Sequence, residues 1–148
     1  MAISWNEIKD RSIKFAKEWE NISSEKSWSQ TFWVRFMDIF GIRLEEVSTF
    51  EYYVEKKLSS KKGFVDLFWP GRVLVEHKSA GENLDSAFGQ AIEYYDGLDP
   101  EEMPRHIIVS DFSRIRLYNL KNWKDYVEFG LEDLPSNLER FDFLTPYE

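Results

Sequence analysis

Apolar side chains in the first forty residues recur with the spacing of an α-helix. Ser4 followed three residues later by Glu7 is a capping-box signature, and it predicts a helix over residues 5–20. Its apolar face would consist of Trp5, Ile8, Phe15 and Trp19. A second start signal at residues 27–30 precedes another apolar face, and Gly41 is the expected C-terminal stop. That second face is made of Phe32, Trp33, Phe36, Met37 and Phe40.

From residue 48 onward the apolar spacing shortens to two, which is typical of β-strands. Strands are predicted at 48–55, 64–69 and 72–79, separated by the polar segment SSKKG and by Pro70-Gly71. After the loop AGENLD, residues 84–97 are predicted to form a helix that ends at Gly97. Further strands are expected at 106–110 and 115–120, with 126–131 as a hairpin partner and 136–144 as a closing helix.

This order of elements predicts an α/β fold with three layers, in which helices flank a mixed central β-sheet. We expect one domain over residues 1–148: N-terminal helices at 1–42, a core at 48–120, and a closing hairpin strand and helix at 121–148.

Composition narrows the class of protein. The chain has no cysteine, which excludes disulfides and thiolate metal sites and suits a cytoplasmic location. No apolar run is long enough to span a bilayer, and the N-terminus lacks the apolar core of a signal peptide, so we expect no membrane contact. The formal net charge of -8 is unusual for a protein that binds phosphate groups.

Three charged residues interrupt the apolar stretch GFVDLFWPGRVLVEHKS at 63–79, namely Asp66, Glu76 and Lys78. The pattern Glu-x-Lys occurs twice more, ending at Lys9 and at Lys57, but in polar surroundings where surface charge is expected. Only the third copy ends an apolar strand and has an acid ten residues before it.

The loop between the two strands decides whether these charges meet. A two-residue turn at Pro70-Gly71 would place Glu76 and Asp66 on opposite faces, but such turns need a positive φ that proline cannot adopt. An odd-length loop, or a bulge, would place both acids on one face with Lys78. Two carboxylates and an ammonium in a buried setting would be costly unless a divalent cation balanced the acids, and Mg²⁺ is the simplest candidate.

Asp66, nine intervening residues and Glu76-x-Lys78 resemble the core motif of the PD-(D/E)xK nucleases. The longer string GFVDLFWPGRVLVEHKSAGENLDSAFGQAIEYYDGL resembles the N-terminal endonuclease domain of type IIL restriction-modification enzymes of the MmeI group. The resemblance continues through MPRHIIVSDFSRIRLYNL and covers roughly residues 28–147. One departure is Val65, which stands where the superfamily name has proline.

The resemblance implies a restriction-endonuclease-like core and assigns roles to its residues. Asp66 and Glu76 would bind Mg²⁺, for which Mn²⁺ can substitute, together with the backbone carbonyl of His77. Lys78 would orient the attacking water and stabilise charge on the phosphate. Gln90, which with Tyr94 resembles a Q-x-x-x-Y element, would support this site, or is an ordinary polar residue on a helix flank.

Other polar residues are given weaker roles by the sequence. Glu25 or Gln30 would supply an additional upstream group, and the sequence leaves this open. The His77 side chain is expected to be packed or hydrogen-bonded, and no chemistry is expected of His106. The charges of Lys61, Lys62 and Arg72 are expected to be solvated, with contact to a DNA backbone as the alternative.

The function implied is a Mg²⁺-dependent endonuclease that cuts double-stranded DNA as the cleavage module of a restriction-modification, phage-defence enzyme. Relatives join this nuclease to an S-adenosylmethionine-dependent DNA methyltransferase and a target-recognition module, so S-adenosylmethionine would serve those modules. The chain stops at TPYE, and we expect an excised domain or a split subunit. The alternatives are a catalytically silent nuclease-fold module for DNA binding or assembly, and a purely structural salt bridge.

Overall fold

The computed structural model describes residues 3–22, 25–43, 49–56 and 61–145, with the side chains of 25–27, 49–56 and 61–65 left out. Its helices are α1 (Trp5–Trp19), α2 (Glu25–Ile39) and α4 (Leu84–Asp96). Its strands are β1 (Thr49–Lys56), β2 (Lys61–Trp69), β3 (Val73–His77), β4 (His106–Ser110), β5 (Arg114–Asn119) and β6 (Val127–Gly130). Four 3₁₀ segments are η1 (Pro100–Glu102), η2 (Trp123–Asp125), η3 (Leu131–Ser136) and η4 (Leu138–Leu144).

The six strands form one sheet in which spatial order follows chain order, β1 to β6. Neighbouring strands are antiparallel except β3 and β4, which run parallel and are joined by the crossover helix α4. A parallel pair needs such a crossover, because the chain must return to the same end of the sheet. The mixed sheet predicted from the order of elements is therefore confirmed.

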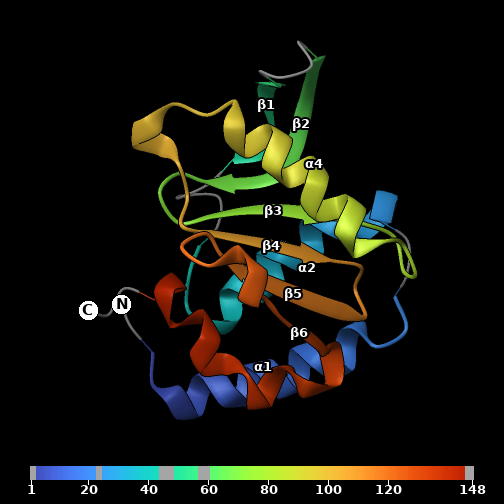
Figure 1. Cartoon of the computed structure of the whole chain (residues 1–148). Helices are drawn as coiled ribbons and strands as arrows, with labels where there is room; N and C mark the ends of the chain where they lie inside the picture. Colours follow the sequence, from blue (N-terminus) through green and yellow to red (C-terminus); the bar gives the residue numbers. More distant parts are fainter. Residues whose placement is uncertain (1–2, 23–24, 44–48, 57–60, 146–148) are drawn as a thin grey trace.

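Helices cover both faces of the sheet (Figure 1). On one face α4 packs through a cluster that includes Phe68, Leu74 and the small residues Ala87 and Ala91. On the other face α1, α2 and the 3₁₀ segments share a larger aromatic core with β-strand residues. Helix, sheet and helix give the three layers that were predicted, and the α/β fold class is confirmed.

Helix α1 follows its sequence signals closely. The Ser4 side chain accepts a hydrogen bond of 3.1 Å from the Glu7 backbone N–H, as an N-cap does. Ile8 is buried together with Phe15 and Trp19, but Trp5 is 42 % exposed. The prediction that Trp5 belongs to the buried face is therefore wrong, because the first turn of α1 is covered through Ile3 and Ile8 and the Trp5 indole faces solvent.

Element boundaries shift where local signals compete with packing. Helix α2 begins at Glu25, two residues before the predicted start signal, and β3 ends at His77 rather than at residue 79. Residues 138–144 form a 3₁₀ segment where an ordinary closing helix was expected. The division of the chain into 1–42, 48–120 and 121–148 stays a prediction.

Asp111 joins the turn between β4 and β5 to the loop that follows β3. Its buried carboxylate accepts hydrogen bonds from the backbone N–H of Gly81 at 2.9 Å and of Arg114 at 2.8 Å. The Arg114 guanidinium donates to the same carboxylate at 2.8 Å. Burial raises the pKa of Asp111, but hydrogen bonds from Arg114 and Gly81 outweigh that effect and hold the pKa below its ordinary value.

A depressed pKa means that the ionised Asp111 stabilises the folded state above pH 4 or so, and that this contribution is lost as the pH falls. We expect Asp111→Asn to lower the free energy of unfolding at pH 7 by about 2 kcal/mol. The loss should shrink between about pH 5 and pH 2. Urea unfolding at several pH values measures both effects. Asp99→Asn is the matched control, since Asp99 is exposed and makes no side-chain cap hydrogen bond; an equal loss in both variants would contradict the assignment.

Candidate functional site

The β2–β3 loop has three residues. Trp69 pairs with Val73, which leaves Pro70, Gly71 and Arg72 between the strands. Gly71 has a φ of 77°, a conformation that glycine adopts without the steric cost of a side chain. The loop is closed by the Arg72 backbone N–H, which donates to the Trp69 carbonyl at 3.0 Å. The prediction of an odd-length loop is confirmed.

This loop length brings the two acids onto one face of the hairpin. Phe68 lies directly opposite Leu74, and both belong to the core beneath α4. Asp66 precedes Phe68 by two residues and Glu76 follows Leu74 by two. Because side chains alternate along a strand, Asp66 and Glu76 project from the same face as this pair, and continuing the register sets them opposite one another.

Hydrogen bonding and charge hold the three charged residues together. The Asp66 carboxylate accepts a 2.6 Å hydrogen bond from the backbone N–H of His77. Glu76 is 5 % exposed, and its Oε2 lies 3.2 Å from the Lys78 ammonium. Beyond β3, the Lys78 backbone N–H donates to the Ser110 carbonyl at 2.8 Å, which keeps this residue aligned with β4. The site therefore combines two carboxylates and one ammonium at the end of a buried strand.

The His77 side chain lies on the opposite face, between α2 and Phe112 of the β4–β5 turn. It is fully buried, and its Nδ1 accepts a 3.0 Å hydrogen bond from the Trp33 indole N–H. Burial lowers the pKa of His77 to about 3, although the Asp111 charge acts in the other direction. This residue is thus neutral at physiological pH, and the prediction of a packed, hydrogen-bonded histidine is confirmed.

Of the supporting residues suggested by the sequence, only Gln90 and Tyr94 lie on the helix that packs on the site's face of the sheet. Gln90 is half-buried on α4, the helix that packs on β3. Tyr94, on the same helix, is buried in the apolar cluster between α4 and the sheet. The role of Gln90 stays a prediction. Gln30 is exposed on α2, a helix of the opposite layer, and the side chain of Glu25 lies outside the described residues.

His106 and Arg72 lie near each other at the other end of β3. His106 pairs with Val73, and its ring stacks on Phe143 with centroids 3.6 Å apart. Burial lowers the pKa of His106 to about 4, so its ring is neutral. The Arg72 guanidinium donates to the Phe143 carbonyl at 2.6 Å, which gives it a partner within the protein. Lys61 and Lys62 have side chains outside those described.

Sequence reasoning missed a buried cation in the same row of the sheet as Glu76. Pairing runs from Glu76 through Val109 to Arg116. The Arg116 guanidinium contacts Asp85 at 2.6 Å and Glu128 at 2.8 Å. Asp85 and Glu128 already neutralise the charge of Arg116. The carboxylates of Asp66 and Glu76 therefore need another cation to balance them. Its position two residues before Tyr118 in an apolar strand was the available signal.

The donor set suits a hard divalent cation. Within the described residues, no group of three or more His, Cys, Asp or Glu side chains is arranged to hold a metal ion. Asp66 and Glu76 provide two carboxylates, and Mg²⁺ is usually bound by one or two when water and substrate oxygens complete its coordination. Zinc would need nitrogen or sulfur ligands, and the neighbouring imidazole faces the other way.

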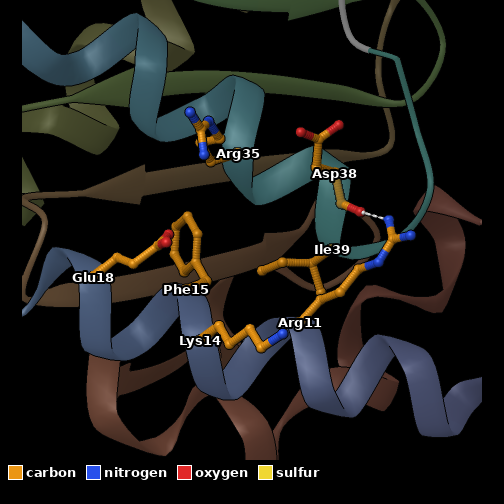
Figure 2. A pocket seen from close by; sticks show the side chains of 7 residues that line it. All are labelled: Arg11, Lys14, Phe15, Glu18, Arg35, Asp38 and Ile39. Atoms are coloured by element: carbon orange, nitrogen blue, oxygen red, sulfur yellow. Dashed lines mark hydrogen bonds between the residues drawn. The ribbon is translucent and has the colours of Figure 1, made fainter.

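A hollow between α1 and α2 lies apart from this site (Figure 2). It has a volume of about 400 Å³. It is lined by Arg11, Lys14, Phe15, Glu18, Arg35, Asp38 and Ile39. The Arg11 guanidinium crosses it to donate to the Asp38 carbonyl at 2.6 Å and also pairs with Glu7. Its charges are mixed in sign, and it belongs to the layer opposite α4.

Comparison with known proteins places the chain in a family. The family profile described as "MmeI, N-terminal domain" matches residues 10–148. The chain belongs to this family of restriction-enzyme domains. A search of curated proteins finds no match. Across the described part of the chain, the helices are too short or too polar to cross a lipid bilayer.

The fold of this MmeI-type N-terminal domain also occurs in a solved structure described as "cryoEM structure DrdV-DNA complex". The TM-score is 0.61 at 16 % sequence identity, over 92 % of this chain and 14 % of that chain. At this identity the likeness establishes the shared fold alone. The domain spans about one seventh of the length of the chain that it matches.

If the two acids share a cation, Mg²⁺ or Mn²⁺ should stabilise the folded domain. At about ten times the dissociation constant, we expect about 1.4 kcal/mol of added stability and a rise in unfolding temperature of about 4 °C. Asp66→Asn keeps an acceptor for the His77 N–H but removes a charge, so it should abolish this shift. Differential scanning fluorimetry with and without the ion tests this. Asp10→Asn, on the exposed side of α1, should retain the shift; its loss there would point to a non-specific ion effect.

Proposed function

We propose that this chain is the metal-dependent endonuclease module of a restriction-modification enzyme and that it hydrolyses phosphodiester bonds of double-stranded DNA. The observation that supports this most directly is the shared face of Asp66 and Glu76, with the Lys78 ammonium 3.2 Å from Glu76. Membership of the MmeI N-terminal domain family supports the same class of enzyme.

In the proposed site, Asp66, Glu76 and the His77 carbonyl would hold Mg²⁺ or Mn²⁺. The bound ion would supply a polarised water and screening of the negative charge that develops on the phosphate. The His77 N–H fixes the orientation of the Asp66 carboxylate before any ligand arrives. Such preorganisation reduces the rearrangement needed when the reactants bind.

Lys78 would act on the attacking water and the phosphate. Its ammonium has three N–H donors and is 20 % exposed, so it can reach solvent and substrate while contacting Glu76. When a water oxygen adds to phosphorus, one bridging P–O bond breaks and a proton passes to the leaving oxygen. A nearby positive charge stabilises the extra negative charge on the phosphate oxygens during this exchange.

The rest of the enzyme would lie in other modules. The domain corresponds to 14 % of the DrdV chain, so partners for methylation and target recognition fit the remaining length of such an enzyme. S-adenosylmethionine would bind in the methyltransferase module. Gln90, on the helix that packs over the site, would assist the metal-bound water or Lys78.

Lys78→Ala should lower the rate of plasmid nicking in Mg²⁺ by about 10²-fold or more, because removal of one group that stabilises charge in the transition state typically has this effect. The unfolding temperature and circular dichroism spectrum should remain those of a folded domain. Nicking assays on supercoiled plasmid measure the loss.

Lys9→Ala is the matched control, since Lys9 ends another Glu-x-Lys copy and is exposed on α1. It should nick at the wild-type rate. Lys57, the lysine of the remaining copy, lies outside the described residues. A wild-type domain with no Mg²⁺-dependent nicking would favour the catalytically silent alternative, and equal activity of Lys78→Ala and wild type would remove the role of Lys78.

The net charge of -8 predicts weak DNA binding by the domain alone. Few basic contacts release few counterions, so affinity should be low and its dependence on salt shallow. Linked modules would instead raise the local concentration of DNA at the nuclease site. We expect slow nicking without sequence preference and weak binding of labelled duplex in Ca²⁺ at about 50 mM salt. Tight, sequence-selective binding by these 148 residues would contradict the dependence on other modules.

A further inference from the structure

The end of β3 is held from behind by an aromatic cage around the His77 imidazole. Its ring centroid lies 5.1 Å from Phe32, 5.8 Å from Trp33 and 4.2 Å from Phe112. Phe32 and Trp33 come from α2, whereas Phe112 comes from the turn between β4 and β5. Three rings from two separate elements therefore converge on a side chain whose backbone belongs to the proposed metal site.

One directional bond distinguishes this cage from an ordinary apolar core. The Trp33 indole N–H donates to His77 Nδ1 at 3.0 Å, so the network assigns the proton of the neutral ring to Nε2. That Nε2 is buried and has no hydrogen-bond partner among the described residues. A phenylalanine could fill this space without burying polar nitrogens. Packing alone therefore does not account for a histidine at this position.

The turn that closes the cage adopts an unfavourable backbone conformation. Phe112 has a φ of 74°, a region that L-residues other than Asn and Asp rarely occupy. Its ring is fully buried against His77, and the adjacent Asp111 fixes the turn through hydrogen bonds to Ser113 and Arg114. The surrounding structure thus holds Phe112 in an unfavourable backbone conformation in which its ring packs on the His77 imidazole.

The three charged residues of the proposed site are linked to the backbone of His77, one by a hydrogen bond and two by peptide bonds. The His77 N–H holds Asp66 at 2.6 Å, and Glu76 and Lys78 are its two chain neighbours. Rotation of the imidazole and its backbone would move both carboxylates relative to each other. A bond that fixes His77 from α2 would therefore fix the spacing of the acids on the other face of the sheet.

We propose that Trp33 and His77 form a positioning pair, in which the indole–imidazole hydrogen bond sets the geometry of Asp66, Glu76 and Lys78 across the sheet. This inference rests on the proposed function of the site. Neither residue touches the reacting atoms through its side chain. Its effect should therefore appear in cation affinity and not only in stability, because groups that orient metal ligands typically influence affinity about 10- to 100-fold.

The first test is Trp33→Phe, which keeps a ring in the cage and removes the N–H donor. We expect its affinity for Mn²⁺, measured by calorimetry without DNA, to be about tenfold weaker than that of the wild type. Trp19→Phe is the matched control, because Trp19 is also buried in this core but stacks on Phe112 and belongs to α1. It should bind Mn²⁺ like the wild type, even if both variants unfold at lower temperatures.

A double variant separates positioning from stability. In Trp33→Phe with His77→Phe, neither ring of the pair has a nitrogen left to bury unpaired, so the unfolding temperature should recover relative to Trp33→Phe alone. Mn²⁺ affinity should stay about tenfold weaker, because the directional bond is still missing. If affinity recovers together with the unfolding temperature, the pair has only a packing role and the inference is overturned.

Asp66→Asn distinguishes failure of this inference from failure of the proposed function. If Asp66→Asn loses Mn²⁺ binding while Trp33→Phe binds like the wild type, the metal site stands and the positioning pair is overturned. If the wild type binds no Mn²⁺, or binds it as Asp66→Asn does, the proposed metal site and the positioning pair both fail. Weaker binding in Trp33→Phe with wild-type binding in Trp19→Phe supports the pair.

Discussion

The candidate site depends on the register of the β2–β3 hairpin. Side chains alternate between faces along a strand, so a slip of one residue would turn Asp66 toward the aromatic core and separate it from Glu76. The three-residue loop fixes the register, and Pro70 and Gly71 explain its length. Proline does not suit the first position of a two-residue hairpin turn, while Gly71 takes the positive φ of 77° that the observed loop needs. One local constraint in the backbone thus determines which face carries the acids.

Two cations on this face, Arg116 and Lys78, have different numbers of acidic partners. Arg116, in the same row as Glu76, is matched by Asp85 and Glu128, whereas Lys78 contacts Glu76 alone among the ion pairs described for it. An excess of carboxylate in a buried place opposes folding, and such local destabilisation is common where function requires it. The aromatic layer on the other face offsets this cost, since many fully buried rings pack there between helices and sheet.

The sequence predicted what depends on short-range patterns and missed what depends on partners far along the chain. Capping at Ser4 and the strand parity that unites Asp66 with Glu76 follow from neighbours within a few residues. The Trp33 to His77 bond joins residues 44 positions apart. Nothing in the local pattern distinguishes that indole from an ordinary core side chain. Trp5 was assigned to the buried face because helical periodicity alone does not tell where the neighbouring layer ends.

The two faces of β3 contribute differently to the site: one carries the charged residues and the other packs against aromatic rings. On the α4 side, Ala87 and Ala91 are buried and small, so the helix can approach the sheet closely. On the other side, large rings from α2 and from the β4–β5 turn leave His77 little freedom. A strand held in this way needs no ordering when a ligand binds, and the entropy of fixing its geometry is already spent during folding. The rigid aromatic face is therefore what allows two repelling carboxylates to remain close on the other.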